Sequence, residues 1–217
     1  MNYTVIRKKS TKREDNVNHY RDYKPVLREE ANKKCVYCAI DENPCGGYDH
    51  FHVEHFRPKS LKSFQNLLKD FENLFYACAI CNRFKSNDWP NDPVKDHSVV
   101  SYADPNETDY NELFNIHENG KICGNFVASK YMIEKINLNR PQLINERKYI
   151  LISEKSEEVI EKIESMVQKI QLEEKSPEID KIISEMLLLS LSTQKLLFKG
   201  RVTPRYEPEE IRRTISK

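Results

Sequence analysis

Two CxxC pairs constrain the fold of this chain more than any other feature. The pairs are Cys35-Val-Tyr-Cys38 and Cys78-Ala-Ile-Cys81, and forty positions separate Cys38 from Cys78. A CxxC turn points two thiolates at one ion, and two such turns supply the four soft ligands of a closed structural zinc site. The segment between them must then loop out as one substructure. The alternative is two pairs of buried cysteines that bind no metal.

The two remaining cysteines, Cys45 and Cys123, have no CxxC partner, and we interpret them as ordinary thiols. A reducing compartment argues against a disulfide framework. Neither pair opens a helix after a strand in a thioredoxin-like context, which disfavours a redox motif. The cysteines therefore predict structural zinc.

Composition indicates a heavily charged protein of one or two domains. The 217 residues are 38% hydrophobic and 32% charged, with a net charge of +1. The longest apolar run, "MLLLSL", is too short to cross a bilayer, and the N-terminus lacks the apolar core of a secretion signal. We expect a cytoplasmic protein without a membrane partner. Residues 1–34 hold ten Lys/Arg against five Asp/Glu, and residues 1–15 are predicted as a flexible basic arm, which could track phosphates or simply be solvated.

Local patterns predict an α+β fold. We expect a short helix over residues 16–34 that starts or breaks near Pro25, a strand at "HVEHF" and a helical stretch near residues 64–71. Residues 88–110 read as turns and loop. "LFNIHENGKICGNF" predicts a hairpin with a two-residue type I′ turn at Asn119-Gly120.

The character of the chain changes at Pro141. Apolar residues then recur at helical spacing, and Ser176-Pro177 opens a second helix that Gly200 and Pro204 end. We therefore predict a domain over residues 1–140 and a helical extension over residues 141–217 that serves in interactions.

The segment between the cysteine pairs holds the candidate catalytic residues. "HFHVEHFRPKS" contains three of the six histidines of the chain. Hydrolysis of a phosphodiester needs a base, a cation and a group that orients the base. Glu54 and His55 are adjacent on the predicted strand, so they project to opposite faces unless the strand bends. Asn73 and Asn82 follow, and Asn82 comes directly after the last cysteine.

The pattern "CVYC…HVEHFRPKS…NLFYACAICNRFKS", over roughly residues 33–90, resembles the HNH endonucleases, whose ββα-metal motif is often bracketed by two zinc-binding CxxC pairs. The resemblance implies that His55 is the general base and that Asn73 fixes the loop around it. It also implies that Glu54 and Asn82 bind a divalent ion, and that the products carry a 5′-phosphate and a 3′-hydroxyl. Many members have His where this chain has Asn82, and an amide oxygen favours Mg²⁺ or Mn²⁺.

A narrower resemblance extends further along the chain. "EHFRPKS", "CNRFKS" and the later "INLNRPQLINERK" are similar to the HNH nuclease subunits of Septu-type and retron-associated anti-phage systems. That resemblance implies a role in antiviral defence beside an ATPase partner.

Other roles stay open for several residues. His52 could be a third ligand, a substrate contact or structural, and Asn82 could cap the helix that follows it. Four cations near the motif could contact nucleic acid or form a solvated face: Arg57, Lys59, Arg83 and Lys85.

Three functions compete for the whole chain. The first is a metal-dependent endonuclease, with DNA as the favoured substrate. The second is a zinc-containing module that binds nucleic acid or a partner without cleaving. The third is an interaction scaffold, built on the helical extension and a second copy or another partner, with a vestigial nuclease.

Overall fold

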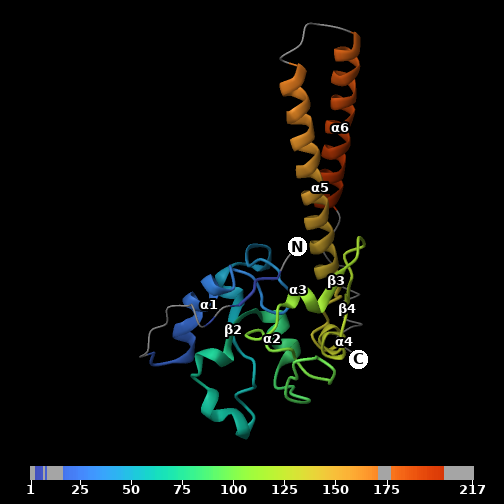
Figure 1. Cartoon of the computed structure of the whole chain (residues 1–217). Helices are drawn as coiled ribbons and strands as arrows, with labels where there is room; N and C mark the ends of the chain where they lie inside the picture. Colours follow the sequence, from blue (N-terminus) through green and yellow to red (C-terminus); the bar gives the residue numbers. More distant parts are fainter. Residues whose placement is uncertain (1–2, 7, 9–16, 171–176, 203–217) are drawn as a thin grey trace. The chain divides into compact units, whose positions relative to one another are not determined.

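The computed structural model describes residues 3–6, 8, 17–170 and 177–202. The chain divides into two compact units (Figure 1). The first consists of residues 1–117 and 121–143, and the second of residues 118–120 and 144–217. The domain boundary expected after residue 140 lies close to the division at residue 143.

A small ββα arrangement lies at the centre of the first unit. Strand β1 (Phe51–His55) pairs antiparallel with β2 (Leu74–Cys78), so that Phe51 faces Cys78 and His55 faces Leu74. All five residues of β2 are buried, as expected of a short apolar strand covered on both faces. Helix α2 (Ala79–Lys85) follows at once, because the Cys78 sulfur accepts a hydrogen bond from the backbone N–H of Cys81 and caps the helix. The predicted α+β fold is confirmed.

The predicted helix near Pro25 is also confirmed. A 3₁₀ turn, η2 (Tyr20–Tyr23), leads into α1 (Lys24–Glu30), which has a proline in its first turn. The Arg28 guanidinium donates to the buried carboxylate of Glu42, and the Tyr76 hydroxyl donates to the same carboxylate. This network ties α1 to β2.

The flexible arm predicted over residues 1–15 is wrong for the residues that the structure describes there. Tyr3, Ile6 and Lys8 are buried. The Lys8 ammonium donates to the carbonyl oxygens of Phe71 and Leu74 and lies 4.0 Å from the centre of the Phe75 ring. A lysine tolerates burial when its apolar stem packs and its ammonium finds acceptors. Residues 1–2, 7 and 9–15 lie outside the described residues.

The predicted hairpin forms, with a different turn. Strands β3 (Phe114–Ile116) and β4 (Ile122–Gly124) pair antiparallel, and the His117 N–H donates to the Lys121 carbonyl oxygen. A type I′ turn needs positive φ at both central residues, but only Gly120 has one (φ +77°). The five-residue connection is therefore not the expected two-residue turn.

Short elements complete the first unit. Where a helical stretch was expected near residues 64–71, the structure has a 3₁₀ turn that ends at Leu67, followed by a non-helical turn. The remaining elements are η3 (Asn43–Cys45), η4 (Tyr48–His50), η5 (Lys62–Leu67), η6 (Phe71–Asn73), α3 (Tyr110–Leu113) and α4 (Val127–Lys135). Residues 88–109 form turns and loop, as expected.

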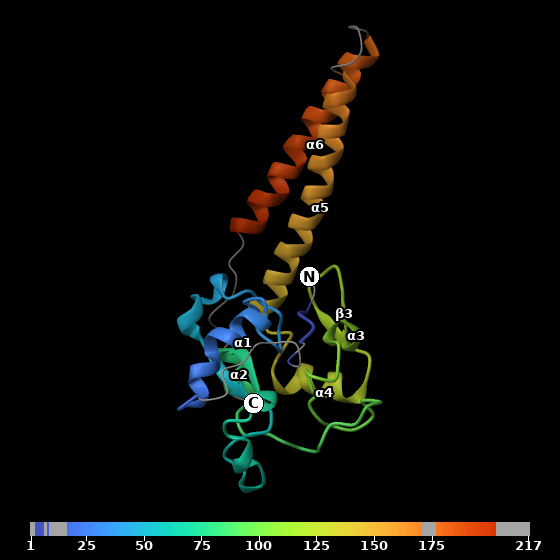
Figure 2. The same ribbon diagram turned by 60° about the vertical axis from the view of Figure 1, so that its left-hand side comes forward.

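The predicted helical extension is confirmed. Helix α5 (Pro141–Ile170) and helix α6 (Pro177–Val202) lie side by side (Figure 2). Helix α6 continues two residues past Gly200, so that glycine does not end it. Within the described residues, no helix is both long and apolar enough to span a bilayer.

Candidate metal centre and nuclease site

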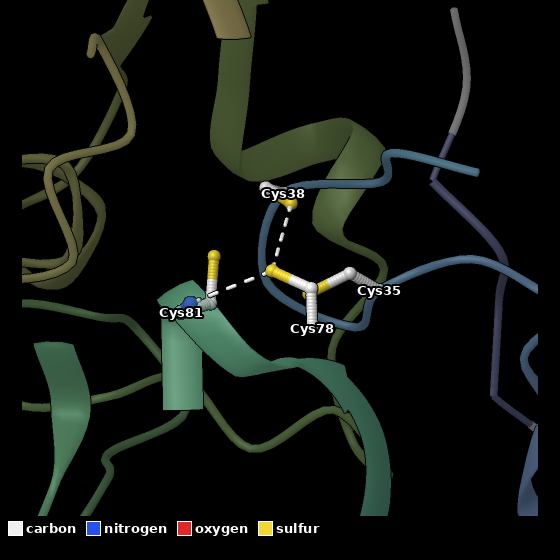
Figure 3. A group of neighbouring side chains, drawn as sticks. All are labelled: Cys35, Cys38, Cys78 and Cys81. Carbon is white, nitrogen blue, oxygen red and sulfur yellow. Dashed lines mark hydrogen bonds between the residues drawn. The ribbon is translucent and has the colours of Figure 1, made fainter. Parts of the chain in front are cut away.

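The four cysteines of the two pairs converge on one point. Figure 3 shows Cys35 and Cys38 on one loop, facing Cys78 and Cys81 at the junction of β2 and α2. The four sulfur atoms lie within 4.8 Å of one another, and all four residues are buried. Zinc with Zn–S bonds of about 2.3 Å holds tetrahedral sulfurs about 3.8 Å apart. The number, chemical type and spacing of the donors therefore fit a Zn(Cys)4 centre.

Backbone hydrogen bonds shape the turn that carries Cys35 and Cys38. The Ala39 N–H donates to the Cys35 carbonyl oxygen, and Ala39 adopts a left-handed conformation with φ +54°. The Val36 N–H donates to the Tyr76 carbonyl oxygen, which joins the turn to β2. Burial raises the pKa of the Cys35 thiol well above its ordinary value, and a bound metal would favour the ionised sulfur. Cys45 and Cys123 are outside this cluster, as predicted.

His55 ends β1 in a largely buried environment. Its Nε2 lies 3.0 Å from the Leu68 carbonyl oxygen, and the Tyr20 ring meets the imidazole edge-on, with centroids 4.7 Å apart. A carbonyl oxygen only accepts, so Nε2 carries the proton and Nδ1 carries the lone pair. Burial lowers the pKa of His55 to about 4. The neutral imidazole thus has Nδ1 available as a proton acceptor.

Asn73 holds the loop around His55. Its Oδ1 accepts from the Arg57 N–H (2.7 Å), and its Nδ2 donates to the carbonyl oxygens of Arg57 (3.1 Å) and Leu67 (3.4 Å). Leu67 precedes Leu68, whose carbonyl accepts from His55. The buried amide therefore joins both sides of the loop that orients the imidazole.

Glu54 lies in surroundings different from those of His55, as strand alternation requires. Its buried Oε1 is 2.8 Å from the Lys85 ammonium and 3.3 Å from the Tyr37 hydroxyl. Lys85 also donates to the His55 carbonyl oxygen (3.1 Å). The carboxylate therefore already has a cationic partner supplied by α2.

Asn82 does not cap a helix. Helix α2 begins at Ala79 with Cys78 as its N-cap, so Asn82 lies within the helix and the cap interpretation is wrong. Its side chain is partly exposed and makes no hydrogen bond within the described part of the chain. Asn82 and Lys85 lie three residues apart on α2 and so share a face of the helix.

The four cations predicted to contact nucleic acid differ in exposure. Lys59 and Arg83 are exposed, and Arg57 is half-buried, 3.9 Å from Asp104. Lys85 is fully buried in its contact with Glu54, so it is not available to a phosphate in this structure. His52 is exposed, and partial loss of solvent around its ring, together with the positive charges of Lys24 and Arg21, lowers its pKa.

Sequence reasoning missed several residues around the site. Tyr20 covers the His55 ring, and its hydroxyl accepts from Lys59 (2.7 Å). Lys8 binds the carbonyl oxygens on either side of Asn73 in sequence. No local sequence motif predicts either contact, because both contacts join segments that are distant in sequence.

The buried position of Lys85 could have been anticipated from sequence. A helix places residue i+4 above residue i, and Cys81 was expected to face the other cysteines of the cluster. Lys85 therefore shares the inward face of α2 with Cys81.

Comparison with known proteins agrees with this geometry. Residues 35–88 match the family model described as HNH endonuclease. No curated protein and no solved structure matches the chain. The matched segment runs from the first cysteine of the cluster to just beyond α2, so it contains the whole ββα unit.

This segment defines an HNH region, and the function that it indicates is of the nuclease type. The family resemblance read from the cysteines and from "HVEHFRPKS" is therefore confirmed over residues 35–88.

Proposed function

We propose that the protein is a metal-dependent endonuclease that hydrolyses phosphodiester bonds of nucleic acid, with DNA as the favoured substrate. The observation that carries the proposal is the arrangement of His55, neutral and fixed through Nε2, at the end of β1 in an HNH region. Nδ1 of His55 takes a proton from water, and the resulting hydroxide attacks the phosphorus in line with the leaving 3′-oxygen. The products are a 5′-phosphate and a 3′-hydroxyl.

Positioning residues act through this histidine. Asn73 fixes the backbone at Arg57 and Leu67, and the Leu68 carbonyl holds the tautomer that leaves Nδ1 unprotonated. Fixing the base in this way removes orientational freedom before the reaction begins.

Glu54 and Asn82 are the proposed ligands of a catalytic Mg²⁺ or Mn²⁺. Carboxylate and amide oxygens suit these ions, and Asn82 is free of other bonds within the described residues. When bound, the ion supplies positive charge against the charge that develops on the phosphate. The Lys85 ammonium already contacts Oε1 of Glu54. The oxygens of Glu54 and Asn82 alone should therefore bind the divalent ion weakly. Mg²⁺ commonly completes its ligand shell with substrate phosphates.

Of the four cations predicted from the sequence to contact nucleic acid, three remain proposed phosphate contacts: Lys59, Arg57 and Arg83. Arg21 and Lys24 extend them, because their positive charges already act on exposed His52 of β1. The proposed path for the nucleic-acid backbone therefore runs beside η2 and the start of α1 as well as past His55.

A partner interface is proposed for the helical extension. Leu187, Leu188, Leu189 and Leu191 of α6 are between 42% and 65% exposed, and contiguous apolar surface of this kind favours protein contacts. The resemblance to anti-phage nuclease subunits favours an ATPase subunit there and a role in defence, with a second copy of the chain as the alternative.

The decisive experiment incubates purified protein with plasmid, with and without Mg²⁺ or Mn²⁺. His55→Ala should lower the cleavage rate by about 10²–10⁴-fold, with zinc content and nucleic-acid binding unchanged. His117→Ala, which removes an exposed histidine outside β1, is the control and should cleave normally. Wild-type protein that binds DNA but cuts none under any of these conditions would favour the binding module without catalytic activity.

A further inference from the structure

Arg140 contacts the cysteine cluster from outside the HNH match. Its Nη2 lies 3.5 Å from the Cys81 sulfur and 4.0 Å from the Cys78 sulfur. The residue is 7% exposed. Among the residues described, it is the charged side chain that donates to these sulfurs.

The charge at the centre explains why a guanidinium belongs there. Four thiolates and one Zn²⁺ carry a net charge of −2, and a buried charge needs a partner. A guanidinium remains protonated throughout the physiological range. One arginine therefore reduces the net charge of the buried assembly to −1, and N–H···S bonds withdraw electron density from the two sulfurs.

The same side chain holds the end of α4. Nη1 of Arg140 donates to the carbonyl oxygens of Ile136 (3.4 Å) and Asn137 (3.3 Å). Carbonyl groups at a helix C-terminus carry partial negative charge. Arg140 thus lies between two negative groups, the thiolates and the helix end.

The neighbouring residue extends this connection to the second hairpin. Asn139 accepts from the Ile122 N–H (2.9 Å) and donates to the Ile122 carbonyl oxygen (2.8 Å). Asn139 therefore connects this turn to β4, and the adjacent Arg140 connects the same turn to the cysteine cluster. That turn lies within the motif "INLNRPQLINERK". The proposed cleavage chemistry assigns no role to this motif.

We propose that Arg140 is the counter-cation of the zinc tetrathiolate centre, and that zinc binding through Arg140 orders the segment from Ile122 to Arg140. The proposal rests on the zinc centre and not on cleavage, so its tests use no nucleic acid. Arg140 acts on the metal through Cys78 and Cys81 and is a positioning residue.

The first test measures how fast a chelator removes zinc from intact protein. Arg140→Met keeps much of the length of the side chain and removes its charge. Partners of metal ligands contribute about 10–100-fold to metal affinity, so we expect zinc release to accelerate by a factor in that range. Arg140→Lys keeps the positive charge but lacks the forked guanidinium group. Its rate of zinc release should therefore fall between the rates of wild type and Arg140→Met.

A matched control separates this role from simple destabilisation. Leu138→Ala removes a fully buried side chain from the same turn and leaves the sulfurs untouched. We expect Leu138→Ala to lower the thermal transition but to retain zinc far better than Arg140→Met at equal stability. Equal zinc release in the two variants would overturn the proposal, as would identical behaviour of Arg140→Lys and Arg140→Met.

A spectroscopic measurement is independent of stability. In Co²⁺-substituted protein, hydrogen bonds to sulfur lower the energy of the sulfur lone pairs and raise the energy of the thiolate-to-metal charge-transfer band. Arg140→Met should therefore shift this band to lower energy, and Leu138→Ala should not. Hydrogen exchange should also show protection of residues 122–140 in the zinc form that weakens in Arg140→Met. An unshifted band, or a protein that holds no zinc, would refute the assignment.

Discussion

His55 combines an ordinary side chain with an unusual environment. Burial is the main reason that its pKa falls to about 4, and the positive charges of Lys59 and Lys85 act in the same direction. The hydrogen bond to the Leu68 carbonyl opposes this shift without cancelling it. A base of this kind is neutral across the whole physiological range.

The lowered pKa predicts an unusual pH profile. A histidine with the ordinary pKa of about 6.5 would be only about one quarter neutral at pH 6, whereas His55 should stay neutral there. We expect the single-turnover cleavage rate at saturating metal to be nearly flat from pH 8 to about pH 5.5. A rate that halves near pH 6.5 would contradict this.

The same shift has a consequence for stability. The folded pKa lies below the unfolded one, so the unfolded chain binds a proton first as the pH falls. Stability contributed by neutral His55 is therefore lost between about pH 6.5 and pH 4. Chemical unfolding of His55→Asn over this window should show a shallower pH dependence than wild type.

Among the elements, α2 is fixed to the sheet at two places. Cys78 and Cys81 join its start to the cysteine cluster, and Lys85 joins its end to Glu54 of β1. Both attachments lie on the inward face of the helix, because residues 81 and 85 are one helical turn apart.

Removing Lys85 should be costly. Lys85→Met leaves the Glu54 carboxylate buried without its cation, and breaking one side of a buried pair costs about 3–5 kcal/mol. Urea unfolding of zinc-loaded protein measures this. Arg83→Met, an exposed cation on the same helix, should change stability little, and adding Glu54→Gln to Lys85→Met should restore part of the loss. Equal effects of Lys85→Met and Arg83→Met would show that the pair is unimportant.

Zinc should be structural for the ββα unit. Cys35→Ser or Cys81→Ser removes one of four candidate ligands that come from two segments distant in sequence, so the metal should be lost and the first unit should unfold. Metal analysis and circular dichroism test this, with Cys123→Ser as the control. Intact wild-type protein with less than about half an equivalent of tightly bound zinc would contradict a structural site.

Whether a feature of the site could be predicted from the sequence depended on how close in sequence the interacting residues are. The CxxC pairs predicted the metal cluster because each turn sets two sulfurs by itself. The pattern around His55 indicated a base, and this role stays a prediction, whereas Asn73 makes the hydrogen bonds to the surrounding loop that its expected role requires. Lys8, Tyr20 and Arg140 could not be foreseen, because each reaches the site from a distant segment. Lys8 also shows that a lysine within a basic run need not be solvated.

At the scale of the whole molecule, charge is nearly balanced. A net charge of +1 provides little long-range attraction for nucleic acid. Affinity must then come from a local path of cations, and the proposed path includes exposed Arg21 and Arg83 beside the site.

This path predicts how binding depends on salt. Each phosphate contact with duplex DNA contributes about −0.9 to the slope of log K against log salt concentration. Arg21→Ala and Arg83→Ala should each reduce the magnitude of the slope by about that amount, because each removes one contact. Filter binding or fluorescence anisotropy with catalytically inactive His55→Ala protein measures the slope without cleavage. Lys181→Ala, an exposed cation of α6, should leave the slope unchanged. If all three substitutions reduced the slope equally, binding would be diffuse over the molecule and the proposed path beside His55 would be wrong.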